Sequence, residues 1–546
     1  MGAWRRRLAT ALGMSGLVLA GAEAAAQQAR FADRTEWAGL DVVHTPVPFD
    51  SVGDVKLGGG AVGDFDRDGW LDVFLLLGGG VPDALYMNRG GGTSHGRVPG
   101  LGGAAVVEGQ PGTGPGGTFV DRAAAWGVDH SHAGAGATVG DYDNDGRLDL
   151  FVTSHGPTGT TPGQHRLYHN EGDHFTDQAA AAGVAFTSPE FVDGYGSAFG
   201  DIDGDGDLDL FVAGWNASQV NPSFGNILFR NEGDGTFTDV TTESGLFLAL
   251  IHSFTPLFVD MDRDRDQDLL IAADFSTSKY LVNDGSGNFT DLTFTNGTGL
   301  DTNGMGQCVA DLDRDGRLDW YVTSIQAPTG TGNKLYRNLG GNQFTETSDA
   351  AGVNLGEWGW GVVAVDVDHD GWEDLVETNG WPTPPWNDLP SLLFMNQGGR
   401  GAVGSFVESG AAAGLDHALD GKAVMRFDAD NDGDQDLLFV ANNQPVRYYR
   451  NELSGPDTHW LHVTLDSRGA PGVAPDGYGA LVIVQTPDGG QQRALNGGGT
   501  YLGCSELSAH FGLGPHTNAT VRVEWPDGTV DVAAGVAADQ RLVISY

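Results

Sequence analysis

Aspartate recurs in this chain at a spacing that suits a hard divalent cation. The pattern Asp-x-Asp-x-Asp-Gly-x-x-Asp occurs seven times, at intervals of 51 to 77 residues, with Arg265 replacing the glycine in the fourth copy. Carboxylates at positions 1, 3, 5 and 9, with a glycine turn at position 6, supply the oxygen ligands that Ca²⁺ prefers. We therefore expect up to seven calcium sites, formed by Asp64, Asp66, Asp68 and Asp72; Asp141, Asp143, Asp145 and Asp149; Asp201, Asp203, Asp205 and Asp209; Asp260, Asp262, Asp264 and Asp268; Asp311, Asp313, Asp315 and Asp319; Asp366, Asp368, Asp370 and Asp374; and Asp428, Asp430, Asp432 and Asp436.

The EF-hand loop is the main alternative, because it shares the first six positions. It also requires a Glu at position 12 and a helix on each side. Position 12 here is Leu75 in the first copy and Val152 in the second, and short apolar runs such as Val73 to Leu77 follow. Runs of this length, bounded by Gly and Asp, are typical of buried strands. The sequence therefore predicts that each loop connects two β-strands.

Two loop positions indicate how the loop is oriented. Position 7 varies freely, as expected for a ligand that is a backbone carbonyl, whereas position 2 is always apolar, as in Phe65 and Val367. One side of each loop should therefore face a core.

In the fourth copy, Arg265 must adopt a turn conformation that costs a non-glycine residue ~1 kcal/mol or more. The site that begins at Asp260 is accordingly expected to be the weakest.

Two further motifs accompany each loop. An aromatic or apolar pair before an Asn, as in Leu85-Tyr86-x-Asn88, follows every copy, and a Phe-x-Asp/Glu motif follows all but the last. Each unit then holds four short strands, and four-stranded units at this period are the signature of a β-propeller blade. The missing seventh Phe motif is found before the first loop, at Phe31, so the N-terminal segment should complete the last blade. The predicted fold class is all-β: a seven-bladed β-propeller with calcium-binding hairpin loops, followed by a small C-terminal β-sandwich-like domain.

With these motifs the chain resembles the FG-GAP or VCBS repeats of integrin α-subunit propellers, over Phe31 to Asn451. The segment after Asn451 resembles the ASPIC/UnbV domain, with Gly477-Tyr478-Gly479-Ala480 and Trp525-Pro526-Asp527-Gly528 in that family's order. The combination resembles the cartilage acidic protein family in its bacterial form. The resemblance implies a secreted calcium-binding interaction protein. We expect the domains 27–451 for the propeller and 452–546 for the ASPIC/UnbV domain.

The chain ends and the composition indicate export. Residues 1–26 combine three arginines, an apolar run and Ala24-Ala25-Ala26, as in a signal peptide cleaved near Ala26. We therefore expect a secreted, extracellular or periplasmic protein. The formal net charge is −44, which seven Ca²⁺ ions would bring to −30, and it argues against nucleic acid as a partner. No further segment is long enough to span a membrane. Cys308 and Cys504 are expected to be two separate thiols, although export leaves a disulfide between them open.

The function predicted first is a binding or adhesion module, expected to be a monomer, whose partner is an extracellular protein or glycan. Its candidate surface is the face opposite the calcium loops, where the sequence places His130, His132, Trp381 and Trp386. The alternative is a carbohydrate-active lyase or hydrolase that uses this His/Trp face. No catalytic motif such as Gly-x-Ser-x-Gly or His-Glu-x-x-His occurs, so no catalytic residue and no organic cofactor is predicted.

Overall fold

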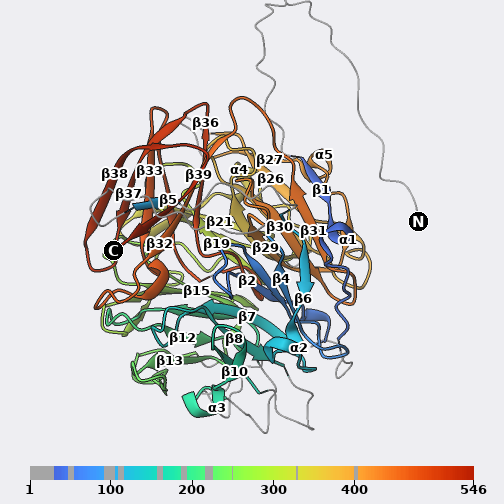
Figure 1. Ribbon diagram of the computed structural model, residues 1–546, viewed down its shortest axis with the longest axis vertical. Helices are drawn as coiled ribbons and strands as arrows, with labels where there is room; N and C mark the ends of the chain where they lie inside the picture. Colours follow the sequence, from blue (N-terminus) through green and yellow to red (C-terminus); the bar gives the residue numbers. More distant parts are fainter. Residues whose placement is uncertain are drawn as a thin grey trace, which may run out of the picture.

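The computed structural model describes residues 30–46, 54–90, 105–107, 116–155, 164–185, 194–215, 225–248, 250–326, 330–398, 404–497 and 499–546. The leader predicted over 1–26 lies outside them. Within the described residues, seven sheets follow one another along the chain; six have four antiparallel strands, and the first has these four and a fifth, parallel strand (Figure 1). Two further four-stranded sheets lie near the C-terminus, and one small sheet has two strands. The predicted all-β class and the seven propeller blades are confirmed.

The blades are numbered by their aspartate loops, which connect the first strand to the second. From the innermost strand outwards, their strands are β2 (Gly60–Gly63), β3 (Asp72–Leu75), β4 (Ala84–Asn88) and β6 (Phe119–Asp121) in blade 1; β7 (Gly134–Gly140), β8 (Asp149–Ser154), β9 (Arg166–Asn170) and β10 (Phe175–Asp177) in blade 2; β11 (Ser197–Gly200), β12 (Asp209–Val212), β13 (Ile227–Asn231) and β14 (Phe237–Asp239) in blade 3; β15 (His252–Val259), β16 (Asp268–Asp274), β17 (Lys279–Asn283) and β18 (Phe289–Asp291) in blade 4; β19 (Gln307–Ala310), β20 (Asp319–Val322), β21 (Lys334–Gly340) and β22 (Gln343–Glu346) in blade 5; β23 (Gly359–Val365), β24 (Asp374–Asn379), β26 (Leu392–Asn396) and β27 (Phe406–Glu408) in blade 6; and β29 (Gly421–Phe427), β30 (Asp436–Ala441), β31 (Arg447–Asn451) and β1 (Phe31–Asp33) in blade 7.

Blade 7 takes its outermost strand from the start of the described chain. β1 pairs antiparallel with β31, and Phe31 lies opposite Asn451. The N–H of Arg34 donates to the carbonyl of Tyr448 at 2.9 Å, and the Arg34 guanidinium pairs with Glu452. The predicted closure of the last blade by the N-terminal segment is therefore confirmed.

Short elements follow the outer strands. One-turn helices end at glycines with positive φ: α1 (Thr35–Ala38), α2 (Ala123–Trp126), α3 (Ala179–Ala182), α4 (Ser348–Ala351) and α5 (Gly410–Ala413). The remaining short elements of the propeller are a 3₁₀ turn, η1 (Asp54–Lys56), and the strand pair β25 (Leu389–Pro390) with β28 (Ala418–Leu419).

Apolar clusters fill the space between neighbouring blades. Phe65, Leu150 and Phe175 pack between blades 1 and 2, and Val62 packs with Met425 between blades 1 and 7. The apolar residue at position 2 is buried in every loop: Phe65, Tyr142, Ile202, Met261, Leu312, Val367 and Ala429. Each loop thus faces a core on one side, as predicted.

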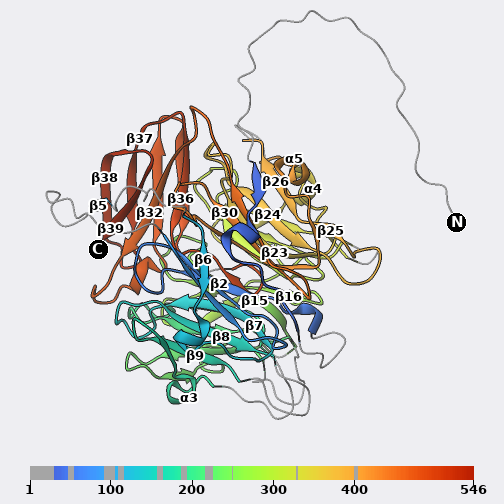
Figure 2. The same ribbon diagram turned by 45° about the vertical axis from the view of Figure 1, so that its right-hand side comes forward.

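The C-terminal module is a sandwich of two four-stranded sheets packed on the loop face of the propeller (Figures 1 and 2). Its first sheet has the order β36 (Ala509–Gly514), β32 (His459–Asp466), β39 (Gln540–Ser545) and β5 (Ala105–Val107), and its second β34 (Gly489–Ala494), β33 (Leu481–Thr486), β37 (Asn518–Glu524) and β38 (Val530–Ala537). A second 3₁₀ turn is η2 (Pro475–Gly477). Because β5 lies between β4 and β6 in sequence, blade 1 contributes a strand to this module.

A segment of the C-terminal module fills the centre of the propeller. Strand β35 (Gly503–Cys504) pairs in parallel with β2. The carbonyl of Leu502 accepts N–H bonds from Gly60 at 3.3 Å and from Ala137 at 3.4 Å, so it joins blades 1 and 2. Tyr501 is fully buried, and its hydroxyl donates to the carbonyl of Lys56 at 2.9 Å. We call residues 499–504 the plug.

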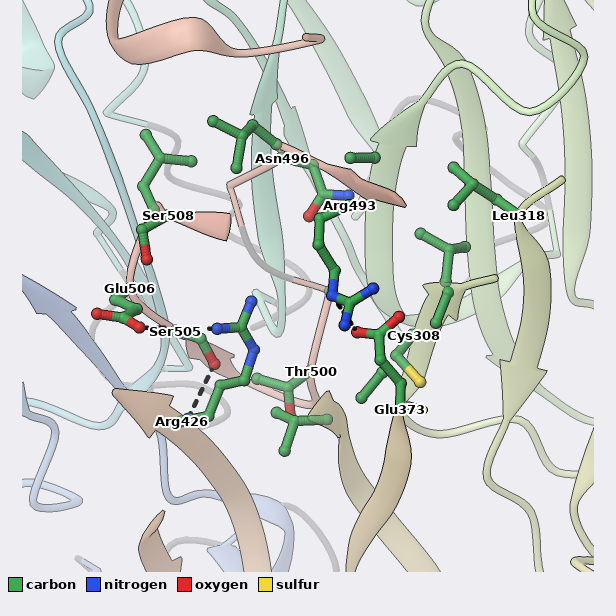
Figure 3. A pocket seen from close by; sticks show the side chains of 18 of the residues that line it. Cys308, Leu318, Glu373, Arg426, Arg493, Asn496, Thr500, Ser505, Glu506 and Ser508 are labelled. Atoms are coloured by element: carbon green, nitrogen blue, oxygen red, sulfur yellow. Dashed lines mark hydrogen bonds and ion pairs between the residues drawn. The ribbon is translucent and has the colours of Figure 1, made fainter. Parts of the chain in front are cut away.

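A small cavity of about 80 Å³ lies beside the plug, between blades 5 to 7 and the C-terminal module (Figure 3). Arg493 Nε lies 3.1 Å from Glu373 Oε1 there, and both side chains are buried. Arg426 Nη1 lies 3.8 Å from Glu506 Oε1. These ion pairs connect the propeller to the C-terminal module around the plug.

Both cysteines are free thiols. Cys308 lies on β19 and Cys504 in the plug. Burial raises the pKa of the Cys504 thiol to about 11. The prediction of two separate thiols is confirmed.

Candidate metal centres of the aspartate loops

Backbone N–H groups hold the first and last aspartates of each loop. In the first loop, Asp64 accepts the N–H of Gly69 at 2.9 Å. Asp72 accepts two bonds, from Phe65 N–H at 3.1 Å and Asn88 N–H at 2.8 Å. The bond from the Asn N–H to the last aspartate recurs in all seven blades. The backbone of the fold therefore orients these carboxylates.

The Asn at the end of each third strand also joins neighbouring blades. The Nδ2 of Asn170 donates to the carbonyl of Phe65 in the preceding blade at 2.9 Å and to that of Leu148 at 3.0 Å. All seven Asn residues reach position 2 of the preceding loop, and Asn88 closes the ring by donating to Ala429 at 2.8 Å. The sequence showed this Asn as a repeat marker but not its contacts.

Two loop positions adopt the left-handed backbone conformation. Position 6 has φ between +84° and +97°: Gly69, Gly146, Gly206, Arg265, Gly316, Gly371 and Gly433. Position 4 has φ between +54° and +72°: Arg67, Asn144, Gly204, Arg263, Arg314, His369 and Asn431. Arg265 thus adopts the conformation expected for it. Position 4 was not predicted, because glycine occurs there only once.

The structure brings the predicted ligands together within each loop. Ligand atoms lie within 4.8 Å of one another in the groups Asp64, Asp66 and Asp72; Asp141, Asp143 and Asp149; Asp201, Asp203 and Asp209; and Asp260, Asp262 and Asp264. In loops 5 and 7, one arginine contacts both position 3 and position 5. In loop 6, the charges of Asp368 and Asp366 contribute to a raised pKa of Asp374.

Several of these carboxylate oxygens have no hydrogen-bond donor. The Oδ1 atoms of Asp141, Asp203, Asp366 and Asp430 are buried and accept no hydrogen bond from any described residue. A buried polar atom without a partner costs about 1–3 kcal/mol. A cation surrounded by the loop carboxylates would remove this cost, so the residues present fit a hard divalent ion.

The electrostatics of the loops point the same way. Burial, assisted by the neighbouring aspartates, raises the pKa of Asp64 and of Asp311 to about 7. In the fourth loop, burial raises the pKa of Asp260 to about 6. Each raised pKa means that the negative charge is costly in the absence of a counter-ion.

Basic side chains reach three of the loops, a contact that the repeat pattern did not predict. His169 Nε2 lies 2.9 Å from Asp143 Oδ2, Arg337 pairs with Asp313, and Arg450 pairs with Asp430. Each of these basic residues directly precedes the Asn of its third strand. That position in the repeat was the signal that could have identified them.

The face opposite the loops carries an aromatic cluster on blade 6. The rings of Trp358 and Trp381 stack at 4.7 Å, and Trp386 meets Trp358 edge-on at 4.9 Å. Trp360 is 1% exposed and packs on Tyr501 of the plug. Trp360 is therefore a packing residue, whereas Trp381 and Trp386 are partly exposed.

A second aromatic group lies on blades 3 and 4 of this face. Trp215 packs beside His252 and Phe275, with ring centroids 5.5 and 5.9 Å away, and Phe275 is 56% exposed. Lys56 Nζ lies 3.2 Å from the centre of the Trp215 ring. This part of the face therefore combines the exposed ring of Phe275 with a buried cation, Lys56.

The histidines of this face contact separate partners. His252 Nδ1 lies 2.6 Å from the carbonyl of Trp215, and His417 Nε2 lies 3.3 Å from Ser391 Oγ. Burial lowers the pKa of His417 to about 4. These contacts fix the orientation of the two imidazole rings.

His132 connects a serine to an aspartate. Its Nδ1 lies 2.9 Å from Ser154 Oγ and its Nε2 lies 2.8 Å from Asp83 Oδ2. Ser154 and Asp83 are each 2% exposed. Serine, histidine and aspartate are the side chains of a serine hydrolase triad, but the Ser154 hydroxyl is buried here.

Comparison with known proteins agrees with this geometry. Residues 158–212, 201–271, 260–322 and 325–377 match the model of the FG-GAP-like repeat, and residues 471–546 match that of the ASPIC and UnbV family. The chain is thus a β-propeller of FG-GAP-like repeats followed by an ASPIC and UnbV domain. It is homologous to cartilage acidic protein 1, with a low sequence identity that is similar in the relatives from different species.

Three such relatives cover different shares of the chain. Cartilage acidic protein 1 of Mus musculus is 24% identical over 441 residues, which cover 74% of this chain and 63% of the relative. The Homo sapiens protein is 25% identical over 373 residues, covering 66% and 44%, and the Xenopus tropicalis protein 27% identical over 266 residues, covering 45% and 38%. The chain therefore spans less than two thirds of the length of these relatives.

No helix in the described part of the chain is both long enough and apolar enough to cross a bilayer.

Proposed function

We propose that this chain is a secreted, calcium-stabilised binding module whose partner is an extracellular protein or glycan. The observation that carries the calcium part is the set of buried carboxylate oxygens without donors, at Asp141, Asp203, Asp366 and Asp430. The leader predicted over 1–26 supports secretion, and the homology to cartilage acidic protein 1 supports an extracellular interaction role.

Calcium should raise the melting temperature of the full chain. Extracellular calcium modules bind with Kd of ~10⁻⁴ to 10⁻³ M. At about ten times Kd, each site adds ~1.4 kcal/mol to the free energy of unfolding. Calorimetry in chelator and in roughly 5–10 mM calcium, about ten times the Kd of the weaker extracellular modules, would measure this effect. Magnesium is the control cation. Identical transitions in chelator and in calcium would exclude a stabilising role for the metal.

The partner is proposed to bind the face opposite the loops. The loop face is largely covered by the C-terminal module, whereas Trp381, Trp386 and Phe275 leave aromatic surface on the other face. Aromatic rings suit both sugar stacking and protein hot spots. The plug fills the channel from the loop side, so its Tyr501 supports the aromatic cluster from below.

A glycan and extracellular-protein array with the purified chain would identify the partner class. Trp386→Ala should weaken the binding found, because truncation of a hot-spot aromatic typically costs about 2 kcal/mol or more. Trp37→Ala is the matched control, since Trp37 is 47% exposed and lies on α1 beside blade 7, whereas the cluster lies on blade 6. Equal loss in the two variants would argue against this face.

The contact of His132 with Ser154 and Asp83 keeps a hydrolase acting on carbohydrate as the second candidate function. A serine at 2% exposure must move before the carbonyl of a carbohydrate ester can reach its hydroxyl. Release of acyl groups from a panel of acylated polysaccharides that is lost in both Ser154→Ala and His132→Ala would support this candidate. Activity that survives both substitutions would exclude this trio as its source.

A further inference from the structure

In loops 5 and 7, an arginine of the third strand pairs with two of the predicted calcium ligands. Arg450 Nη2 lies 2.5 Å from Asp430 Oδ2 and 2.8 Å from Asp432 Oδ2. Arg337 Nη2 pairs with Asp313 Oδ2 and lies 3.7 Å from Asp315 Oδ2. The side chains of Asp313 and Asp430 are only 6% exposed, so these pairs are screened little by solvent.

The equivalent residue in loops 1 and 6 carries no charge. Met87 and Met395 occupy the same register position in their third strands, one residue before the Asn that pairs with the Phe of the outer strand. Arg337 and Arg450 have this position in blades 5 and 7. Within the repeat, this position is therefore filled by methionine in blades 1 and 6 and by arginine in blades 3, 5 and 7. Arg230 of blade 3 pairs with Glu232 instead of a loop aspartate, at 2.8 Å.

Two further arginines contact the aspartates of loops 7 and 5. In loop 7, Arg541 of the C-terminal module donates to Asp428 Oδ2 at 3.1 Å, so guanidinium groups contact positions 1, 3 and 5. In loop 5, Arg317 at position 7 pairs with Asp315. Loops 1 and 6 have Trp70 and Trp372 at position 7 instead.

We propose that Arg337 and Arg450 compete with calcium for the aspartates, so that loops 5 and 7 bind calcium more weakly than loops 1 and 6. This inference rests on the proposed calcium function. An arginine stays charged at every accessible pH and holds carboxylates in a fixed fork. The aspartates of loops 5 and 7 must therefore release a guanidinium, or accept a cation close to one. Loop 4 has Val282 at this position and differs instead by Arg265.

The arginines have a second consequence for the protein without calcium. They neutralise aspartates that would otherwise repel one another. Loops 5 and 7 should therefore keep their shape at low calcium concentration, whereas loops 1 and 6 depend on the ion. The propeller would then consist of blades stabilised by its own side chains and blades stabilised by calcium.

Substitution by methionine, the residue of loops 1 and 6, tests the proposal in the full chain. Arg337→Met and Arg450→Met should each tighten one calcium site roughly tenfold, because affinity follows the charge of the ligand set. Both variants should also melt below wild type in chelator. Arg447→Met is the control, because Arg447 lies on the same strand as Arg450 and pairs with Asp33 at 3.4 Å, away from the loops.

The converse variant, Met395→Arg, should weaken one of the tight sites by a similar factor. It keeps the proposal testable if an arginine variant fails to fold. Calcium titration calorimetry and equilibrium dialysis give the affinity and the number of sites. Wild-type-like titrations in both Met395→Arg and the folded arginine variants would overturn this inference alone. A wild-type chain that binds no calcium would overturn the proposed calcium function as well.

Discussion

Arg265 adopts the left-handed backbone conformation that glycine adopts in the other six loops, with φ of +84°. Unlike glycine, it carries a β-carbon in this conformation. Arg265→Gly should tighten the fourth calcium site, by up to ~1 kcal/mol, if its loop relaxes without the ion. The melting temperature should change little, because glycine also raises the entropy of the unfolded chain. Titration calorimetry measures the first effect and thermal unfolding the second.

Arg265→Ala separates the strain from the charge. Alanine removes the guanidinium but keeps the β-carbon, so it leaves the backbone strain in place. If alanine tightens the fourth site as much as glycine does, the effect of Arg265 is electrostatic and not conformational.

Glu377 is a fully buried carboxyl on β24. Its Oε2 accepts hydrogen bonds from Tyr321 at 3.0 Å and Asn333 at 2.7 Å, and its Oε1 has no donor among the described residues. Burial raises the pKa of Glu377 well above its usual 4.5. The unfolded chain thus loses this proton at a lower pH than the folded protein does. Stability is therefore lost as the pH rises from about 4.5 towards the folded pKa.

Glu377→Gln keeps the shape of the side chain and cannot ionise. It should melt roughly 2 °C or more above wild type at pH 8, and the difference should vanish near pH 4. Melting curves from pH 4 to 8 at fixed calcium concentration measure this. Glu243→Gln, on an exposed turn, is the control and should follow wild type. A Glu377→Gln curve parallel to wild type would show that Glu377 ionises without cost.

At the scale of elements, the plug joins the C-terminal module to the propeller. Tyr501→Ala removes a fully buried ring and should cost about 3–5 kcal/mol of the free energy of unfolding, whereas Tyr501→Phe should cost about 1 kcal/mol for the bond to the Lys56 carbonyl. Thermal unfolding and limited proteolysis after Asn451 measure the two losses. Tyr546→Ala, at an exposed position, is the control. A fully stable Tyr501→Ala protein would mean that the plug contributes no net stability.

Local patterns predicted most of the elements. The aspartate loop fits within nine residues, so its turn, its ligands and the strands on either side could be derived from spacing alone. The Asn and Phe motifs gave the third and fourth strands in the same way. The plug could not be derived, because 499–504 has no strand alternation and its partner, Gly60, lies more than 400 residues away. The ion pairs of Arg337 and Arg450 with their loop aspartates could not be derived for a different reason: they depend on which side of the third strand faces the loop.

At the scale of the whole molecule, the N-terminal segment closes the ring. Deletion of Phe31–Leu40 removes β1 and α1, leaves β31 as an open edge and exposes the surface that Phe31 covers in the cluster between blades 6 and 7. The whole propeller should melt at a lower temperature, and the open edge should promote association. Light scattering and calorimetry measure the two effects. A monomeric truncated protein with the melting temperature of the full chain would show that closure is achieved elsewhere.

The contact between Arg34 and Glu452 spans 418 residues of chain. During synthesis at ~5–20 residues per second, β1 therefore exists for roughly 20 to 80 s before its partner strand does. Six blades can form in that interval, but the seventh cannot. A strand that waits so long is an aggregation hazard unless it is short and charged. β1 has three residues, and Arg30, Asp33 and Arg34 lie in it or beside it. Its composition thus suits the delay as well as the final pairing.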